Sequence, residues 1–292
     1  MTASYKLGDR NDYVSKIQRA LNEIVYSGLK TDGFFGQQTK DSLQDWQIYF
    51  GIEPDGIYAG RTAEILNKYI YDRFLAEQDY KIAAIKLNVT EPIVRAVTEV
   101  EAKGYGFLQS GRSTILYERH IFFRYFSRKL KERPGLIKNI KKNLAIPDAP
   151  ETADAFLTYL QQKYPLIINP TPGGYQGTVK GIEHEYKKIE FASKIDDECA
   201  LYSVSYGLFQ IMGFNHKASG FNTVNDMYIA CARSERNQLD AFCNFVLNDR
   251  RMITALRTKN MLQFALAYNG PAQKGYDKKL EEALRKWENI LK

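Results

Sequence analysis

Residues 90–104 read TEPIVRAVTEVEAKG, and this stretch predicts a short helix around which the rest of the chain is organised. Thr90 can serve as the N-cap, because its hydroxyl can accept a hydrogen bond from the first turn. Glu91 and Pro92 then fall at the first helical positions, where an acid and a proline are tolerated. Gly104 provides a natural stop at the C-terminal end.

The apolar face of this helix carries a carboxylate near its C-terminal end. Val94, Val97 and Glu101 recur at helical spacing, so the glutamate points the same way as the valines. Glu99 points elsewhere and is expected to be solvated. Burial and the negative end of the helix dipole both disfavour the charged form of Glu101, so we expect a raised pKa and a general acid. The alternative is a glutamate that reaches out to water from the helix end.

The chain has 292 residues, of which 44% are hydrophobic and 26% charged, as expected of a globular protein with two domains or one large one. No stretch approaches the ~20 apolar residues of a membrane span, so no stable membrane insertion is expected. The N-terminal sequence MTASYKLGDRND contains no apolar segment typical of a secretory signal. We therefore expect folding in a cytoplasm, and release by another route if the protein acts outside.

The formal net charge of +7 suits an anionic partner, such as nucleic acid, a membrane surface or an anionic cell wall. Basic and acidic residues are interleaved and no nucleic-acid-binding motif is present, so no nucleic-acid partner is expected. Cys199, Cys231 and Cys243 form no CxxC pair and are expected to be reduced, buried thiols. The histidines are scattered without a Cys/His cluster, so neither a metal site nor another cofactor is expected.

Two strings near the N-terminus echo each other: residues 32–39 read DGFFGQQT and residues 55–62 read DGIYAGRT. The pair predicts a repeated unit in which Asp-Gly forms a turn and Thr39 or Thr62 caps the helix that follows. An earlier helix has apolar residues at helical spacing, namely Val14, Ile17, Leu21 and Ile24. Because the acids of this region lie in turns or on polar faces, we expect a three-helix module (1–72) with a binding role.

A mainly helical second domain is expected over residues 80–292. Residues 71–80, YDRFLAEQDY, precede it as a linker or a joining helix. Within the domain, residues 169–177, NPTPGGYQG, predict a loop that either lines a groove or simply connects two elements. Residues 183–185, EHE, begin a helix and are expected to be solvated, because adjacent side chains on a helix do not converge on one ion.

Residues 113–120, STILYERH, alternate with a strand-like period that predicts a short β-patch. Glu118 lies in this patch, and a helix end followed by a glycine-rich turn can bring it near Glu101. Paired carboxylates in unlike environments are what glycoside hydrolysis uses, one as acid and one as base or nucleophile. The alternative is a salt bridge from Glu118 to Arg119 or Arg112.

Three features occur in order along the second domain: the helix-end glutamate, SYGLFQIMG at residues 205–213 and ALAYNG at residues 265–270. Together they resemble the lysozyme-like superfamily of goose-type lysozymes and lytic transglycosylases. The strings VEAKGYGF, ILYERHIFF, NPTPGGYQG, SVSYGLFQIMGFN and YNGP more narrowly resemble the N-acetylmuramidase domain of phage endolysins from Gram-negative hosts. At the N-terminus, the strings from LGDR through PDGIYAGRT resemble the peptidoglycan-binding domain of many cell-wall hydrolases.

This resemblance implies a mainly α fold: a three-helix peptidoglycan-binding module, then a lysozyme-like, mostly helical catalytic domain with a small β-hairpin. It implies a peptidoglycan hydrolase, an endolysin that cleaves the β-1,4 bond between N-acetylmuramic acid and N-acetylglucosamine for host lysis. Peptidoglycan is the expected partner, and the protein is expected to be a monomer. We expect it in the host cytoplasm and then, after release through a holin, in the periplasm.

Carried onto this sequence, the resemblance makes Glu101 the general acid and Glu118 the candidate second carboxylate. Gln210, Tyr268 and Asn269 become substrate contacts. For Tyr268, a buried ring whose hydroxyl is satisfied locally is an equal alternative. The GLF string just before Gln210 is expected to serve packing and close backbone approach rather than direct contact with sugar.

Two other functions are open at this point. A lytic transglycosylase forms a 1,6-anhydro product and needs no second carboxylate. Such enzymes commonly have Glu-Ser, whereas this chain has Glu101 followed by Ala102. A non-catalytic wall-binding phage protein would keep the fold without the activity.

The C-terminal residues 276–292 predict an amphipathic helix. Its apolar residues lie at helical spacing, namely Leu280, Leu284, Trp287 and Leu291. A helix that closes the core is the favoured interpretation, and contact with anionic outer-membrane lipid is the alternative.

Overall fold

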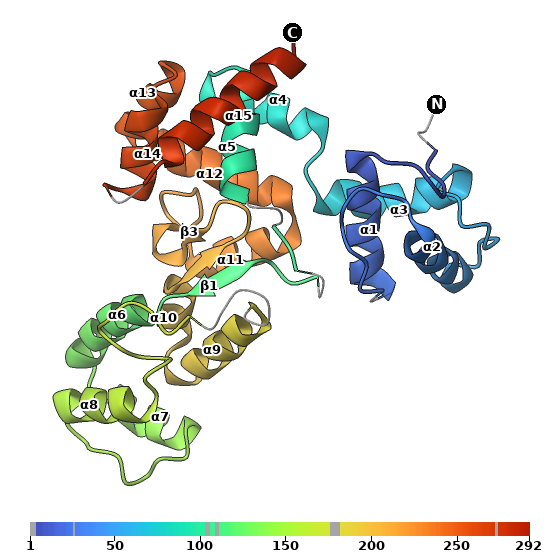
Figure 1. Cartoon of the computed structure of the whole chain (residues 1–292). Coiled ribbons are helices and arrows are strands. Elements are labelled where there is room, and N and C mark those ends of the chain that lie inside the picture. The colour runs from blue at the N-terminus through green and yellow to red at the C-terminus, as the bar shows by residue number, and fades with distance from the viewer. Residues whose placement is uncertain (1–3, 26, 103–105, 109–110, 176–181, 272–273) are drawn as a thin grey trace.

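The computed structural model describes residues 4–25, 27–102, 106–108, 111–175, 182–271 and 274–292. Figure 1 shows the N-terminal helices (blue) at one side, a small sheet at the centre and a group of green helices at the far end. Two clusters of buried apolar side chains form separate cores, and the fold is mainly α as expected. Within the described residues, no helix is both long and apolar enough to cross a membrane.

Three helices build the N-terminal core: α1 Asp12–Val25, α2 Gln37–Tyr49 and α3 Gly60–Arg73. The predicted apolar face of α1 is confirmed, because Val14, Ile17 and Leu21 are fully buried. They pack in one cluster with Trp46 of α2 and Leu66 of α3. Burial of these side chains against one another stabilises helices that are too short to be stable alone.

The two predicted Asp-Gly turns are confirmed. Gly33 and Gly56 have φ angles of 72° and 68°, in the left-handed region that favours glycine. In the second turn, Asp55 Oδ1 accepts a hydrogen bond from the amide of Ile57 (2.8 Å), which closes the turn locally.

Each Asp-Gly turn also encloses a glutamine from the preceding helix. Gln47 accepts a hydrogen bond from the amide of Gly56 (2.9 Å) and donates one to Thr62 Oγ1 (2.9 Å). In the first copy, Gln18 donates to Thr39 Oγ1 (3.1 Å). The expected capping role of the two threonines is wrong, because each lies inside its helix and its hydroxyl accepts from a glutamine instead.

The connection between the two cores is shorter than the expected linker over residues 71–80. Helix α3 continues to Arg73 and helix α4 (Glu77–Leu87) follows, so residues 74–76 alone join them. Phe74 is buried in the N-terminal core and Leu75 in the larger one. The join is therefore anchored on both sides.

The larger core is enclosed by helices from the rest of the chain. After α4, they are α5 Glu91–Ala102, α6 Arg119–Glu132, α7 Leu136–Asn143, α8 Ala153–Lys163, α9 Ile182–Ile195, α10 Asp197–Tyr202, the 3-10 helix η1 Gly213–Asn215, α11 Val224–Arg233, α12 Glu235–Asn248, α13 Arg250–Arg257, α14 Met261–Asn269 and α15 Tyr276–Ile290. Helix α5 is the predicted one and begins directly after Thr90. Its predicted stop, Gly104, lies outside the described residues.

A three-stranded antiparallel sheet lies at the centre, in the order β1 Ile115–Tyr117, β2 Val204–Tyr206 and β3 Ile211–Met212. Strands β2 and β3 form the expected hairpin, and β1 adds a third strand. The predicted patch over residues 113–120 is only partly a strand, because Glu118 is the N-cap of α6 and His120 is helical.

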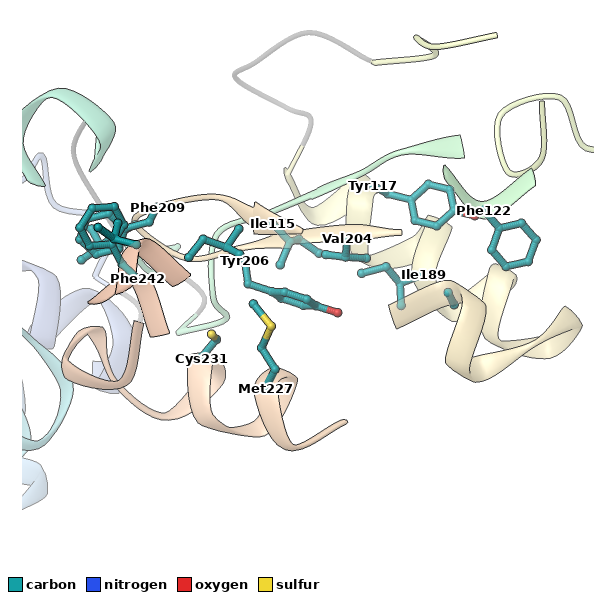
Figure 2. Close-up of a cluster of buried hydrophobic side chains, with 14 of the residues drawn as sticks. Ile115, Tyr117, Phe122, Ile189, Val204, Tyr206, Phe209, Met227, Cys231 and Phe242 are labelled. Atoms are coloured by element: carbon teal, nitrogen blue, oxygen red, sulfur yellow. The ribbon is translucent and has the colours of Figure 1, made fainter. Parts of the chain in front are cut away.

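One face of the sheet packs on the larger core. Figure 2 shows Ile115, Val204 and Tyr206 on this face, next to Met227 and Cys231 of α11. All five side chains are buried. The opposite face of the sheet carries Leu116, Ser205 and Met212, which are paired across the strands.

The C-terminal helix packs against the larger core, which confirms the favoured interpretation of residues 276–292. Helix α15 lies along α5 in Figure 1 and buries Leu280 and Leu284. Lys286 and Trp287 of α15 reach the carboxylate of Glu99 on α5, at 3.0 and 2.8 Å. Glu99 is thus exposed, as expected, and its carboxylate is also bound by α15 at the surface.

The three cysteines are free and buried, as predicted. Burial raises the pKa of Cys231 to about 12. Burial also raises the pKa of Cys243 to about 12. Both thiols are therefore protonated and weakly nucleophilic at neutral pH.

Replacing Gln47 with Ala should destabilise the N-terminal module by about 1–3 kcal/mol, because the buried amide of Gly56 and hydroxyl of Thr62 lose their partner. Urea unfolding followed by the fluorescence of Trp46 measures this effect. The matched control is Gln38→Ala, at an exposed position of α2, which should change stability by less than about 0.5 kcal/mol. Equal stability of the two variants would contradict the structural role of Gln47.

Candidate active site

Glu101 lies in the last turn of α5, where tyrosines from two other helices approach it. Its Oε1 atom accepts a hydrogen bond from the hydroxyl of Tyr276, at the start of α15. Burial, and then the nearby charge of Glu101, raise the pKa of Tyr268 on α14 well above its ordinary value. Helices α5, α14 and α15 therefore meet around the predicted acid, which is only partly buried.

The turn between β2 and β3, residues 207–210 (GLFQ), lies beside Tyr268. The hydroxyl of Tyr268 donates to the carbonyl oxygen of Phe209 (2.8 Å). Its ring stacks on Phe264, with 5.4 Å between the ring centroids. The hydroxyl of Tyr268 is thus hydrogen-bonded inside the protein, which agrees with the interpretation of Tyr268 as a buried ring with a locally bound hydroxyl.

The conformation of the GLFQ turn depends on two residues in the left-handed region. Gly207 has φ 67°, and a Cβ there would lie 2.3 Å from the side chain of Gln238, so only glycine fits. Gln210 has φ 48°, and its side chain supports the turn. It donates to the carbonyl of Gly207 (2.8 Å) and accepts from Ser205 Oγ (2.7 Å).

The outer face of the sheet extends from the GLFQ turn toward Glu118. The strand register pairs Leu116 with Ser205, and Ser205 with Met212. Because alternate residues point to opposite faces, these three side chains lie away from the core, together with Thr114 and Glu118. Thr114 and Glu118 flank β1 at opposite ends, and about 13 Å of extended chain separates them at ~3.3 Å per residue.

Glu118 is bound by a tyrosine and lies next to a histidine. Its Oε2 atom accepts a hydrogen bond from the hydroxyl of Tyr175 (2.6 Å) and lies 3.2 Å from Nδ1 of His120. Burial, followed by the hydrogen bond to Glu118, raises the pKa of Tyr175 to about 12. The alternative expectation for Glu118 is a salt bridge with Arg119 or Arg112. That expectation is wrong, because neither arginine forms a salt bridge with Glu118 in the described structure.

Arg119 instead holds the loop that carries Tyr175. Its guanidinium donates to the carbonyl oxygens of Pro165 (2.9 Å) and Thr171 (3.0 Å). Tyr175 is half exposed at the end of this loop. The last residues of the NPTPGGYQG string, 176–177, lie outside the described part of the chain. The described part of the loop places Tyr175 against Glu118, and both interpretations of the loop stay open.

A buried ion pair on α9 binds both β1, which precedes Glu118, and the loop that carries Tyr175. Lys188 and Glu185 of α9 lie 2.6 Å apart, and each side chain is at most 5% exposed. Lys188 also donates to the carbonyl oxygen of Gly174 (3.0 Å), and Glu185 accepts from the amide of Tyr117 (2.9 Å). The expectation of a solvated helix start is therefore wrong for Glu185, because its carboxylate serves β1 and Lys188. The pair connects the two segments that meet at Glu118.

The predicted site residues fall into two groups. Glu101, Tyr268 and Gln210 surround or form the GLFQ turn at one end of the sheet, whereas Glu118 lies at the other end. Asn269 is exposed directly after Tyr268, at the end of α14.

Two tyrosines contact the predicted carboxylates, and neither contact follows from the sequence pattern. Tyr276 is 175 positions from Glu101, and no periodicity relates the two. Tyr175 had a usable signal, because it is the aromatic residue of a glycine-rich loop expected to line a groove. Distant contacts of this kind come from tertiary packing alone.

A glutamate at a helix end beside a short β-hairpin, within a mainly helical scaffold, is the arrangement of a lysozyme-type glycoside hydrolase. The profile of the N-acetylmuramidase family matches residues 90–288, and that of a peptidoglycan binding domain matches residues 10–66. The chain therefore belongs to the N-acetylmuramidase family and has a peptidoglycan-binding module before its muramidase domain.

One solved structure resembles the chain over nearly its whole length, and one curated protein resembles a short part of it. The crystal structure of the endolysin of Burkholderia AP3 phage is 38% identical, covers 98% of this chain and 100% of its own, and superposes with a TM-score of 0.60. An uncharacterized protein from the bpoA1 3′ region of Kitasatospora aureofaciens is 38% identical over 55 residues, or 18% of this chain. The chain spans about half the length of that curated relative (47%).

Replacing Lys188 with Met should destabilise the muramidase domain by about 3–5 kcal/mol, because it leaves the buried Glu185 carboxylate without its cation. Thermal unfolding monitored by circular dichroism measures the loss. The neighbouring Lys187 is exposed, so Lys187→Met is the matched control and should shift stability by less than about 0.5 kcal/mol. A Lys188→Met protein as stable as this control would show that the pair contributes nothing.

Proposed function

We propose that this protein is an endolysin-type N-acetylmuramidase that hydrolyses the β-1,4 bond between N-acetylmuramic acid and N-acetylglucosamine in peptidoglycan. The observation that carries the proposal is the position of Glu101. It is a partly buried carboxylate at a helix end, bound by Tyr276 and adjacent to Tyr268, which binds the GLFQ turn. The family match and the 38% identity with a phage endolysin support the substrate and the role in lysis.

Glu101 acts as the general acid in this proposal. It gives its proton to the glycosidic oxygen as the carbon–oxygen bond breaks, so the leaving sugar departs as a neutral alcohol. Oε1 accepts a hydrogen bond from the Tyr276 hydroxyl, which orients the carboxyl group. After the transfer, the same hydroxyl stabilises the carboxylate by a charge-assisted hydrogen bond.

Glu118 is the proposed second carboxylate, which stabilises positive charge on the sugar or activates the attacking water. Tyr175 orients it on the outer face of the sheet. Its position at the far end of β1 fits activation of a water better than direct attack, which requires carboxylates about 5 Å apart. The same position favours a second candidate, a lytic transglycosylase, in which a hydroxyl of the substrate itself attacks and no second carboxylate is needed.

The two domains have separate roles in this proposal. Residues 1–72 bind peptidoglycan and residues 80–292 cleave it, which the match to a peptidoglycan binding domain supports. Gln210, Tyr268 and Asn269 contact the sugar chain, with Asn269 the most exposed of the three. The protein acts as a monomer and reaches the periplasm of its host through a holin.

Glu101→Gln should lower muramidase activity by about 10²- to 10⁴-fold, the usual contribution of a general acid, while the fold is retained. Turbidity loss of purified Gram-negative sacculi measures activity, and circular dichroism checks the fold. Glu99→Gln is the matched control on the same helix, because Glu99 is exposed and binds Lys286 and Trp287 of α15. A fully active Glu101→Gln protein would sink the assignment.

Mass spectrometry of the soluble muropeptides should show reducing N-acetylmuramic acid ends, and Glu118→Gln should lower their rate of release. Ends that are lighter by one water would identify a lytic transglycosylase, and that enzyme should tolerate Glu118→Gln. No release from sacculi that the protein nevertheless binds would leave the non-catalytic wall-binding function.

A further inference from the structure

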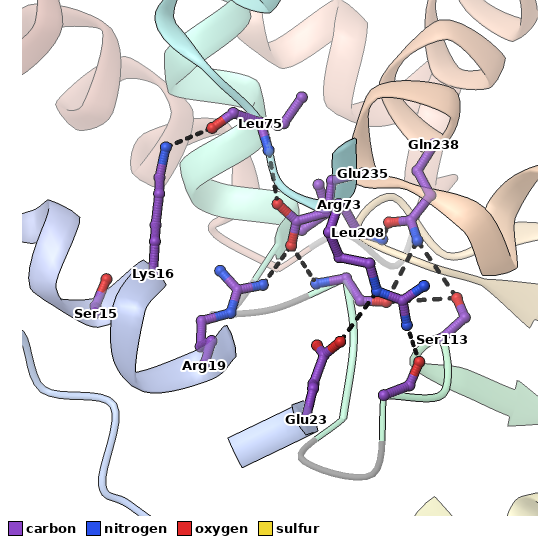
Figure 3. A network of polar contacts seen from close by, with 12 residues as sticks. Ser15, Lys16, Arg19, Glu23, Arg73, Leu75, Ser113, Leu208, Glu235 and Gln238 are labelled. Carbon is purple, nitrogen blue, oxygen red and sulfur yellow. Dashed lines mark hydrogen bonds and ion pairs between the residues drawn. The ribbon is translucent and has the colours of Figure 1, made fainter. Parts of the chain in front are cut away.

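A set of buried polar contacts runs from the N-terminal module to the segment after α5 (Figure 3). At its centre is Glu235, the first residue of α12, which is only 4% exposed. Its carboxylate forms an ion pair with Arg19 of α1 and accepts hydrogen bonds from the amides of Leu75 and Gly106, both at 3.1 Å. One acid therefore binds the N-terminal module, the join between the cores and the chain that follows Glu101.

The position of Gly106, which Glu235 fixes, is linked by further contacts to the GLFQ turn. A Cβ at Gly106 would lie 2.4 Å from Gln238 Oε1, so its backbone is pressed against α12. The carbonyl of Gly106 accepts from the amide of Thr114 (2.8 Å), and Gln238 Oε1 accepts from the amide of Leu208 (2.8 Å). Glu235 and Gln238 thus hold both segments beside the proposed acid.

An apolar contact reinforces the polar ones. Phe107 belongs to the N-terminal core, where its ring centroid lies 6.3 Å from that of Phe74. The guanidinium carbon of Arg73 lies 3.7 Å from the ring centroid of Phe107, and Arg73 also donates to the carbonyls of Gly111 and Ala232. The segment between α5 and β1 is therefore anchored in the wall-binding module as well as in the muramidase domain.

We infer that Arg19 is a positioning residue of the active site, which acts through Glu235 on Gly106 and the GLFQ turn, and so on the alignment of Glu101 with the substrate. The wall-binding module then contributes to the chemical step as well as to affinity for the wall. This inference rests on the proposed function, in which Glu101 is the acid. Without the Arg19 cation, the buried carboxylate of Glu235 loses its ion pair, and its hold on Gly106 weakens.

Short, peptide-free glycans of alternating N-acetylglucosamine and N-acetylmuramic acid test the inference, because retention on the wall does not limit their cleavage. Arg19→Met in the full chain should lower kcat by roughly ten- to a hundredfold with KM little changed, since a displaced acid loses alignment rather than substrate affinity. Arg19→Lys keeps the charge and should recover most of the rate. In the Glu101→Gln background, adding Arg19→Met should leave binding to sacculi unchanged.

Two further variants test whether Arg19 acts through Glu235 and whether the loss of any arginine has the same effect. Arg250→Met removes an exposed arginine at the start of α13 and should leave kcat unchanged. If Arg19 acts through Glu235, the double variant Arg19→Met/Glu235→Gln is no slower than Glu235→Gln alone, whereas additive losses contradict that route.

Two results would overturn the positioning role: full kcat of Arg19→Met on the short glycans, or a loss that only follows the unfolded fraction measured by circular dichroism. An active Glu101→Gln protein on the same glycans overturns the acid assignment instead. The two failures are therefore distinguishable.

Discussion

Gly106 and Phe107, between the Glu101 helix and β1, are buried, and the backbone polar groups there must be satisfied inside the protein. Two side chains on neighbouring positions of α12 meet this need: Glu235 binds the amide of Gly106, and Gln238 binds the amide of Leu208. The close approach of these side chains excludes a Cβ at positions 106 and 207. The relative placement of α5, the GLFQ turn and the sheet depends on this arrangement.

Buried carboxylates need a cation, and two of those in the described residues, Glu235 and Glu185, connect separate parts of the structure. Glu235 pairs with Arg19 of the wall-binding module, which makes the two cores parts of one polar network. Glu185 pairs with Lys188 and binds the end of β1 beneath Glu118. Desolvating such a charge costs several kcal/mol unless it is paired and hydrogen-bonded, so both sites favour one arrangement of the segments they join.

Local patterns in the sequence predicted local structure well. The apolar spacing of α1, the two Asp-Gly turns and the start of α5 each depend on residues close together in the chain, and each is confirmed. The patterns failed where a distant side chain competes. Thr39 and Thr62 cap nothing because glutamines bind their hydroxyls, and Glu185 is buried because its carboxylate binds Lys188 and the amide of Tyr117.

The sequence by itself determined the mainly helical fold, the order of its two modules and the family, because these depend on short-range periodicity and on stretches that the two family profiles match. Tertiary structure alone decided that Tyr276 binds Glu101, that Glu118 lies at the far end of the sheet, and that Arg19 reaches Glu235. These contacts join segments far apart in the chain. Packing and the pairing of buried charges select them, and neither leaves a period in the sequence.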